Sequence, residues 1–129
     1  MKYFKRANIY KNYSGDAIYH PETKEGFSYH WWQVCGVFKG KKVFNTYYYS
    51  NTTVKHQSAI RALFGSVDLE VKAPKGLKDK AAIIRFYINE NKQLRRLINR
   101  PRTHKVKNRE RAGMIKRNQS TLLQVRKWL

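Results

Sequence analysis

Two neighbouring segments, residues 29–38 and 42–49, are rich in aromatic and β-branched residues and are joined only by Lys39-Gly40-Lys41. Such runs around a short glycine-containing connection predict a β-hairpin. Because a type II′ turn favours glycine at its first central position, we expect the turn at Gly40-Lys41. Trp32, Val34 and Phe38 then share one face of the hairpin, and Gln33, Cys35 and Val37 share the other. The expected cross-strand pairs are Lys39 with Lys42, Phe38 with Val43, Val37 with Phe44, Cys35 with Thr46, Val34 with Tyr47, Gln33 with Tyr48 and Trp32 with Tyr49.

A short helix and a strand are expected after this hairpin. Thr52 or Thr53 can cap the helix, and Gly65 can end it. Its expected apolar stripe consists of Ala59, Ile60, Leu63 and Phe64. Apolar and charged residues then alternate over 67–72, which predicts a strand.

Two further helices are expected in the second half of the chain. The first covers about Lys78 to Asn99, because Pro101 disfavours helical backbone angles in the residue before it. Its expected buried side consists of Ile83, Ile84, Tyr87, Ile88, Leu94, Leu97 and Ile98. The second lies near 120–129 and has one apolar side, made of Leu122, Val125, Trp128 and Leu129.

These elements predict an α+β fold. Its small antiparallel sheet consists of the hairpin 29–49 and a strand near 67–72, accompanied by three helices and a basic segment. Hydrophobic residues make up 41% of the 129-residue chain, enough for a folded core. We expect residues 1–99 to form a globular α+β region. Residues 100–129 should form a basic arm with the C-terminal helix, as part of the same single domain.

Positive charge is concentrated at the end of the chain. Residues 94–129 carry twelve Lys and Arg but one acid, Glu110, which gives +11 of the total formal charge of +20. Because such a density repels itself, it indicates a polyanionic partner, and a phosphate backbone is the natural one. The candidate nucleic-acid-binding residues in this segment are Arg95, Arg96, Arg100, Arg102, Lys105, Lys107, Arg109, Arg111, Lys116 and Arg117.

The segment 29–65 resembles the three-stranded DNA-binding modules of the ethylene-response-factor type and of integrase arm-binding domains. The resemblance rests on Trp32-Gln33-Val34, on Lys39-Gly40-Lys41-Lys42, and on Tyr49 followed by Thr52-Thr53 and Ala59. It departs from that pattern at Val54-Lys55-His56-Gln57, where the family has an acidic, Ala-rich helix start. The resemblance implies that the sheet face away from the helix enters the major groove. The implied contacting side chains are Trp31, Gln33, Lys39, Lys42 and Tyr48.

No catalytic or metal-binding pattern is recognisable. The four histidines lack metal-ligand spacing, the eight acids are scattered, and Cys35 stands alone. We therefore expect no enzyme activity, no metal and no cofactor. The N-terminal residues have no apolar signal region and no run approaches a membrane span, so we expect a cytoplasmic protein without membrane contact, in the host cytoplasm if phage-encoded.

The leading functional expectation is a nucleic-acid-binding protein that acts mainly through electrostatic backbone contacts with DNA or RNA. One alternative is a small phage accessory protein that binds host RNA polymerase and modulates transcription. Its motivation is a composition rich in Lys, Asn, Tyr and Ile, together with the apolar C-terminal helix. The other alternative is a ribosomal-type RNA-binding component, in which a globular domain carries a basic extension.

Overall fold

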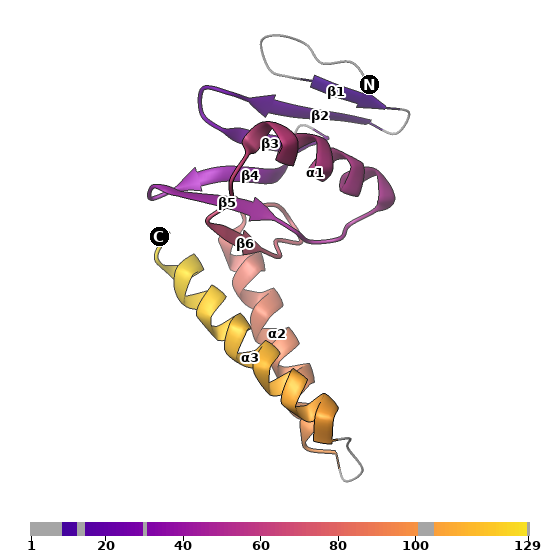
Figure 1. Ribbon diagram of the computed structural model, residues 1–129, viewed down its shortest axis with the longest axis vertical. Helices are drawn as coiled ribbons and strands as arrows, with labels where there is room; N and C mark the ends of the chain where they lie inside the picture. Colours follow the sequence, from indigo (N-terminus) through magenta and orange to yellow (C-terminus); the bar gives the residue numbers. More distant parts are fainter. Residues whose placement is uncertain (1–8, 13–14, 30, 101–104, 129) are drawn as a thin grey trace. The chain divides into compact units, whose positions relative to one another are not determined.

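The computed structural model describes residues 9–12, 15–29, 31–100 and 105–128 of the chain. The chain divides into two compact units, unit 1 over Met1–Ile83 and unit 2 over Ile84–Leu129. A sheet with one helix forms most of unit 1, and two long helices dominate unit 2 (Figure 1). The expected α+β class is confirmed. The expected division after residue 99 is not observed, because the boundary falls inside the second helix.

Unit 1 contains a six-stranded sheet whose strands follow one another in chain order. Neighbouring strands are antiparallel, except that the last two are parallel. The expected sheet is therefore too small and wrongly all antiparallel: three strands precede the hairpin, and the strand near 67–72 joins in parallel. A parallel neighbour is possible here because a helix carries the chain back along the sheet before the last strand. The strands are β1 (Ile9–Asn12), β2 (Gly15–His20), β3 (Glu25–Ser28), β4 (Trp32–Phe38), β5 (Lys41–Asn45) and β6 (Leu69–Val71).

The turn between β4 and β5 is formed by Lys39 and Gly40, not by Gly40 and Lys41. Both turn residues have positive φ, 49° and 79°, as a type I′ turn requires. Val37 consequently pairs with Lys42 and Cys35 with Phe44, two positions away from the expected partners. Because side chains alternate with a period of two, this shift leaves every residue of the turn-proximal half on its expected face.

A β-bulge interrupts the alternation at the start of β4. Gly26 pairs with Cys35 but the next residue, Phe27, pairs with Gln33, so Val34 is the additional residue. Since Gly26 and Phe27 point to opposite faces, Cys35 and Gln33 do so as well. The expectation that these two side chains share a face is wrong, because a bulge leaves no clear signal in the hydrophobic pattern.

The helix α1 (Asn51–Phe64) begins one residue after Ser50. The Ser50 hydroxyl accepts a hydrogen bond from the Thr53 backbone N–H at 3.2 Å, and the Thr53 hydroxyl accepts one from the Ser50 N–H at 2.9 Å. This reciprocal pair is a capping box, so Ser50 is the cap and neither threonine is. Gly65 ends the helix with φ 83°, as expected.

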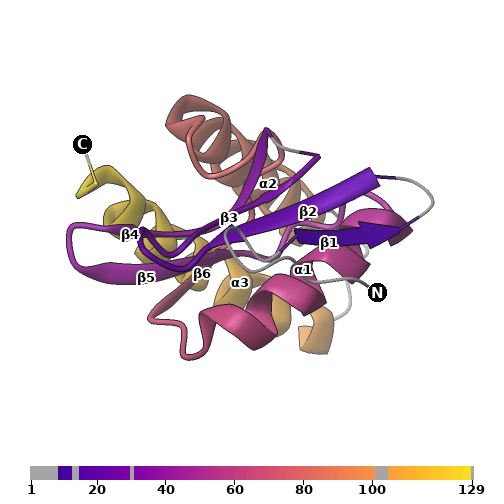
Figure 2. The same ribbon diagram turned by 90° about the horizontal axis from the view of Figure 1, so that it is seen from above.

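One side of α1 packs on the sheet, where it contacts β2, β3 and β4 (Figure 2). Ile60 and Phe64 lie in the core with Tyr19, Cys35 and Phe44. The approach is close at Gly26, where an added Cβ would lie 2.6 Å from the Ile60 Cγ2 atom. Of the expected apolar stripe, Ala59, Ile60 and Phe64 are buried, whereas Leu63 is exposed.

Unit 2 contains most of α2 (Lys80–Ile98) and all of α3 (Lys105–Arg126). The bounds of α2 agree with the expected helix, although Ile88 is exposed. By contrast, α3 starts about fifteen residues before the expected last helix, because the basic segment is itself helical from Lys105 onward. The prediction relied on apolar periodicity, which this segment lacks. Its Lys, Arg, Glu, Met and Ala residues nevertheless have good helix propensity.

Candidate nucleic-acid interface

The helices α2 and α3 lie side by side and antiparallel as a helical hairpin (Figure 1). The amide nitrogen of Asn118 on α3 donates to Oε1 of Glu90 at 3.0 Å and to Oδ1 of Asn91 at 2.9 Å. Asn118 and Asn91 are buried. Since the Asn118 amide finds both of its acceptors on α2, this contact fixes how the two helices align.

The apolar side of α3 is only partly the one expected. Leu122 and Val125 are buried. Trp128 is half-buried. Leu129 lies outside the described residues.

The antiparallel arrangement gathers cations at the connected end of the helical hairpin. The end of α2 and the start of α3 meet there, so residues on both sides of the connection share one region of the surface. We call the exposed cations of this region the tip cluster. Its described members are Arg95, Arg96, Arg100, Lys105, Lys107 and Arg109. Arg102, also expected at the interface, lies outside the described residues.

Few opposite charges neutralise the tip cluster. Two ion pairs of the described residues, Arg61 with Glu70 and Lys78 with Glu25, lie outside this cluster and use none of Arg95, Arg96, Lys105, Lys107 and Arg109. Arg111 is half-buried and donates to Oδ1 of Asn108 at 3.1 Å. The positive charge of Arg95, Arg96, Lys105, Lys107 and Arg109 is therefore available to an external anion.

The charges at the start of α3 also favour binding of an external anion. The first turn of α3 contains Lys105 and Lys107 but no acid. A helix N-terminus carries partial positive charge and normally favours acids, so cations placed there are repelled and destabilise the helix. An anion bound at this end would relieve that repulsion.

Both helices also present cations away from their shared interface. On α3, Lys105, Arg109 and Lys116 follow helical spacing and are exposed. On α2, Arg85 and Lys92 occupy one exposed side. Lys105 and Lys116 are eleven residues apart, or about 16 Å along a helix with a rise of about 1.5 Å per residue. Sequence analysis missed Arg85 and Lys92, although their seven-residue spacing on an expected helix was a usable signal.

Of the second group of expected contacts, from the β4–β5 region, three side chains are exposed and two are not. Trp31 and Tyr48 are exposed by 60% and 62%. Lys39 is exposed in the turn. These three side chains are accessible, as the prediction requires.

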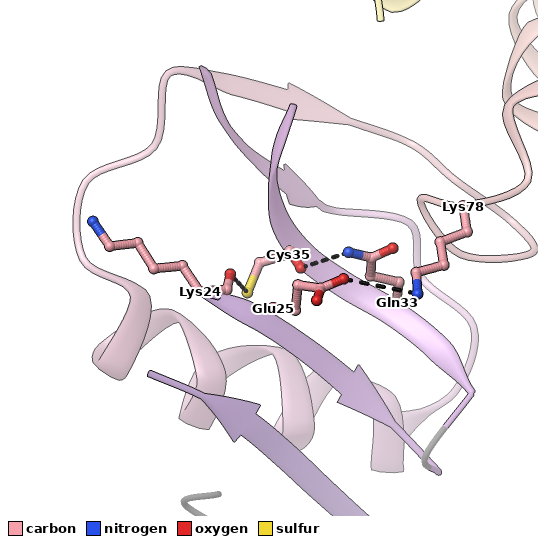
Figure 3. Close-up of polar contacts among 5 residues, drawn as sticks. All are labelled: Lys24, Glu25, Gln33, Cys35 and Lys78. Atoms are coloured by element: carbon pink, nitrogen blue, oxygen red, sulfur yellow. Dashed lines mark hydrogen bonds and ion pairs between the residues drawn. The ribbon is translucent and has the colours of Figure 1, made fainter. Parts of the chain in front are cut away.

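Two residues of that group cannot act as expected. Gln33 is 1% exposed, and its amide nitrogen donates to the Cys35 carbonyl at 3.1 Å (Figure 3). Lys42 lies on the α1 side of the sheet, because it is two residues away from Phe44 in β5 and therefore shares its face. Its ammonium group donates to the Phe64 carbonyl and lies 4.4 Å from the Phe64 ring centroid. Gln33 is therefore buried and Lys42 points toward α1, so neither side chain can reach a groove of DNA.

The buried nucleophilic groups are unsuited to chemistry. The Ser28 hydroxyl lies 2.6 Å from Nδ1 of His56, but both residues are completely buried, so a substrate could not reach them. Burial raises the pKa of the Cys35 thiol to about 12, and its sulfur lies 3.6 Å from the Lys24 carbonyl (Figure 3). A thiol with so high a pKa is a poor nucleophile near neutral pH.

Within the described part of the chain, no three or more His, Cys, Asp or Glu residues gather so that they could hold a metal ion. The helices of that part also include none with the length and apolar character needed to cross a membrane. Comparison of the chain with protein-family models, curated proteins and solved structures finds no match.

Proposed function

We propose that the protein binds nucleic acid through the helical hairpin, mainly by contacts with the phosphate backbone. The observation that carries this proposal is the tip cluster: six exposed cations, five on the two helices and Arg100 just after α2, at one end of a unit. Unit 2 has fourteen Lys and Arg against two acids in its sequence, a formal charge of +12. Because these charges lie on helices, presenting them avoids the entropy cost of ordering an unstructured arm.

Backbone contacts fit the chemistry of this surface better than base readout. Specific base recognition relies on side chains with a donor and acceptor pattern, such as Asn and Gln, or on Arg held in a fixed geometry. The tip cluster instead consists of long, exposed cations, which neutralise phosphates and release counterions. Nucleic-acid affinity should therefore depend strongly on salt concentration and weakly on base sequence.

The test replaces three cations of the helical hairpin with glutamine: Arg96, Lys105 and Arg109. Duplex affinity is measured by fluorescence anisotropy over a range of salt concentrations. If roughly 6–10 phosphates are neutralised, wild-type affinity should fall about 10³–10⁵-fold between about 50 and 200 mM salt. The logarithmic slope of the variant should be smaller by about 0.9 for each phosphate that it no longer neutralises.

A matched control replaces Lys24, Lys55 and Lys75, three exposed lysines of unit 1, with glutamine. Its total charge equals that of the hairpin variant, and we expect a smaller loss of duplex affinity. Equal losses in the two variants would reject the helical hairpin as the interface. Wild-type affinity that hardly changes with salt would reject electrostatic backbone binding altogether.

Experiments with the wild-type protein also separate the two alternative functions raised by the sequence, a ribosomal-type component and a protein that docks on RNA polymerase. Pure backbone binding predicts that DNA and RNA duplexes compete almost equally, whereas a ribosomal-type component should prefer structured RNA. A protein that docks on RNA polymerase should co-purify with it after nuclease treatment. Loss of co-purification on nuclease treatment supports direct nucleic-acid binding.

A further inference from the structure

A groove of about 280 Å³ runs along α1 in unit 1. The helix packs on β2, β3 and β4, and the groove is lined by α1 and by residues of β5 and the segment after it. Val54, Gln57, Ser58 and Arg61 follow one another at spacings of three, one and three residues, which places them on a single side of α1. The opposite wall and the floor consist of Phe44, Thr46 and Tyr48.

Flat groups dominate this groove. The Tyr48 side chain is 62% exposed, and its hydroxyl donates to Oδ1 of Asn51 at 2.7 Å, which restrains the ring. The guanidinium of Arg61 lies 4.9 Å from the Phe44 ring centroid and pairs with Glu70 at 3.1 Å. The groove therefore has an aromatic ring on one side and a held, planar cation on another. Both are surfaces on which a nucleobase can stack.

Two polar groups complete the lining. The amide nitrogen of Gln57 donates to the backbone carbonyls of Asn45 at 2.7 Å and of Tyr47 at 3.0 Å. These bonds fix the amide so that its oxygen is left to accept a hydrogen bond. The exposed Ser58 hydroxyl can donate and accept. Together they match the mixed donor and acceptor edge of a base.

The electrostatics favour a nucleic acid over other occupants. The chain has a formal charge of +20, and the groove itself contains Arg61. A larger cavity of about 620 Å³ in the same unit is lined by Glu22 and Glu25, which would repel a phosphate chain. The groove beside α1 is smaller than most small-molecule sites, which span about 300–1,000 Å³, and suits one flat ring.

We propose that this groove binds an unpaired nucleobase, so that unit 1 holds a single-stranded segment of nucleic acid. The inference rests on the proposed nucleic-acid-binding function and adds a substrate class to it. A base inside a duplex is stacked and paired, so only an unpaired base can enter. Tyr48 stacks on the base, and Ser58 and Gln57 contact its edge.

The test compares single-stranded and duplex oligonucleotides of equal length with variants of full-length protein. Tyr48→Ala should weaken single-strand binding about 5- to 150-fold, the range expected for loss of one stacked base. Tyr48→Phe keeps the ring and loses only the hydroxyl bond to Asn51, so it should weaken single-strand binding much less than Tyr48→Ala does. Ser58→Leu should also weaken single-strand binding, because it fills the groove from an exposed helix position. Duplex affinity should stay unchanged in all three variants.

Tyr49→Ala is the matched control, since Tyr49 is 55% exposed but its ring centroid lies 6.0 Å from that of Trp32. It should leave single-strand affinity unchanged. A single strand carrying 5-iodouracil should also form a photo-crosslink at Tyr48, located by mass spectrometry. This readout uses wild-type protein and does not depend on how the variants fold.

Three outcomes would overturn the inference: unchanged single-strand affinity in Tyr48→Ala, an equal loss in Tyr49→Ala, or crosslinks that avoid the groove. The first is also expected if the groove accepts a protein side chain instead. Duplex binding that persists in any of these cases leaves the proposed function standing. Absence of binding to both duplex and single strand at low salt rejects the proposed function itself.

Discussion

At the scale of single residues, the buried amide of Asn118 decides how the helical hairpin is held. It donates to Glu90 and Asn91 across the two helices. Alanine at this position would leave polar groups near the interface without their donor, at a cost of about 1–3 kcal/mol. We therefore expect Asn118→Ala to lower the free energy of unfolding by that amount in urea titrations.

The neighbouring Gln119 provides a control for this prediction. It is exposed on α3, and alanine is a better helix former than glutamine. Gln119→Ala should change stability by less than about 0.5 kcal/mol. Equal effects of the two substitutions would show that the amide contacts do not stabilise the helical hairpin.

At the scale of elements, two glycines predict opposite effects of the same substitution. Gly26 lies where α1 meets the sheet, and an added Cβ would lie 2.6 Å from Ile60 Cγ2 and 2.9 Å from Cys35 Sγ. Gly26→Ala should therefore destabilise the protein by about 1–3 kcal/mol, the usual cost of overpacking a core.

Gly113 lies inside α3, where the nearest atom to an added Cβ is Arg117 Nη1 at 3.6 Å. Alanine fits there, and glycine is costly in a helix, so Gly113→Ala should stabilise by about 0.5–1 kcal/mol. Thermal and urea unfolding of the two variants check the signs. Destabilisation by Gly113→Ala would argue against a continuous α3 in solution.

At the scale of the whole molecule, the formal charge of +20 predicts opposite salt effects on folding and binding. Salt screens self-repulsion with a Debye length of about 10 Å at about 0.1 M, so the melting temperature should rise with ionic strength. Nucleic-acid affinity should fall over the same range. Calorimetry in sodium chloride without nucleic acid measures the first effect.

The variant with glutamine at Arg96, Lys105 and Arg109 is the control for the salt effect on folding. It carries less repulsion, so its melting temperature should rise less with salt than that of the wild type. A melting temperature that falls with salt in the wild type would mean that favourable ion pairs outweigh repulsion in the folded state.

Local signals explain which parts of the fold the sequence predicted. The bounds of α2 follow from Pro101 and an apolar period, and the end of α1 follows from Gly65. The cap of α1 was misplaced by two or three residues, because Ser50, Thr52 and Thr53 all have suitable side chains. The helical course of the basic segment was missed, because the prediction relied on an apolar stripe, which this segment lacks, and not on the helix propensity of its residues.

The sequence by itself determined the α+β class, the β4–β5 hairpin and the concentration of cations after Leu94. These depend on composition and on periods that extend over a few residues. Only the tertiary structure decided that β6 is parallel to β5, that a bulge places Gln33 on the face opposite Cys35, where it is buried, and that Lys42 lies under α1. It also brought Tyr48 and Arg61 to one groove. Strand pairing, burial and shared surfaces depend on contacts between distant segments, and no local pattern encodes them.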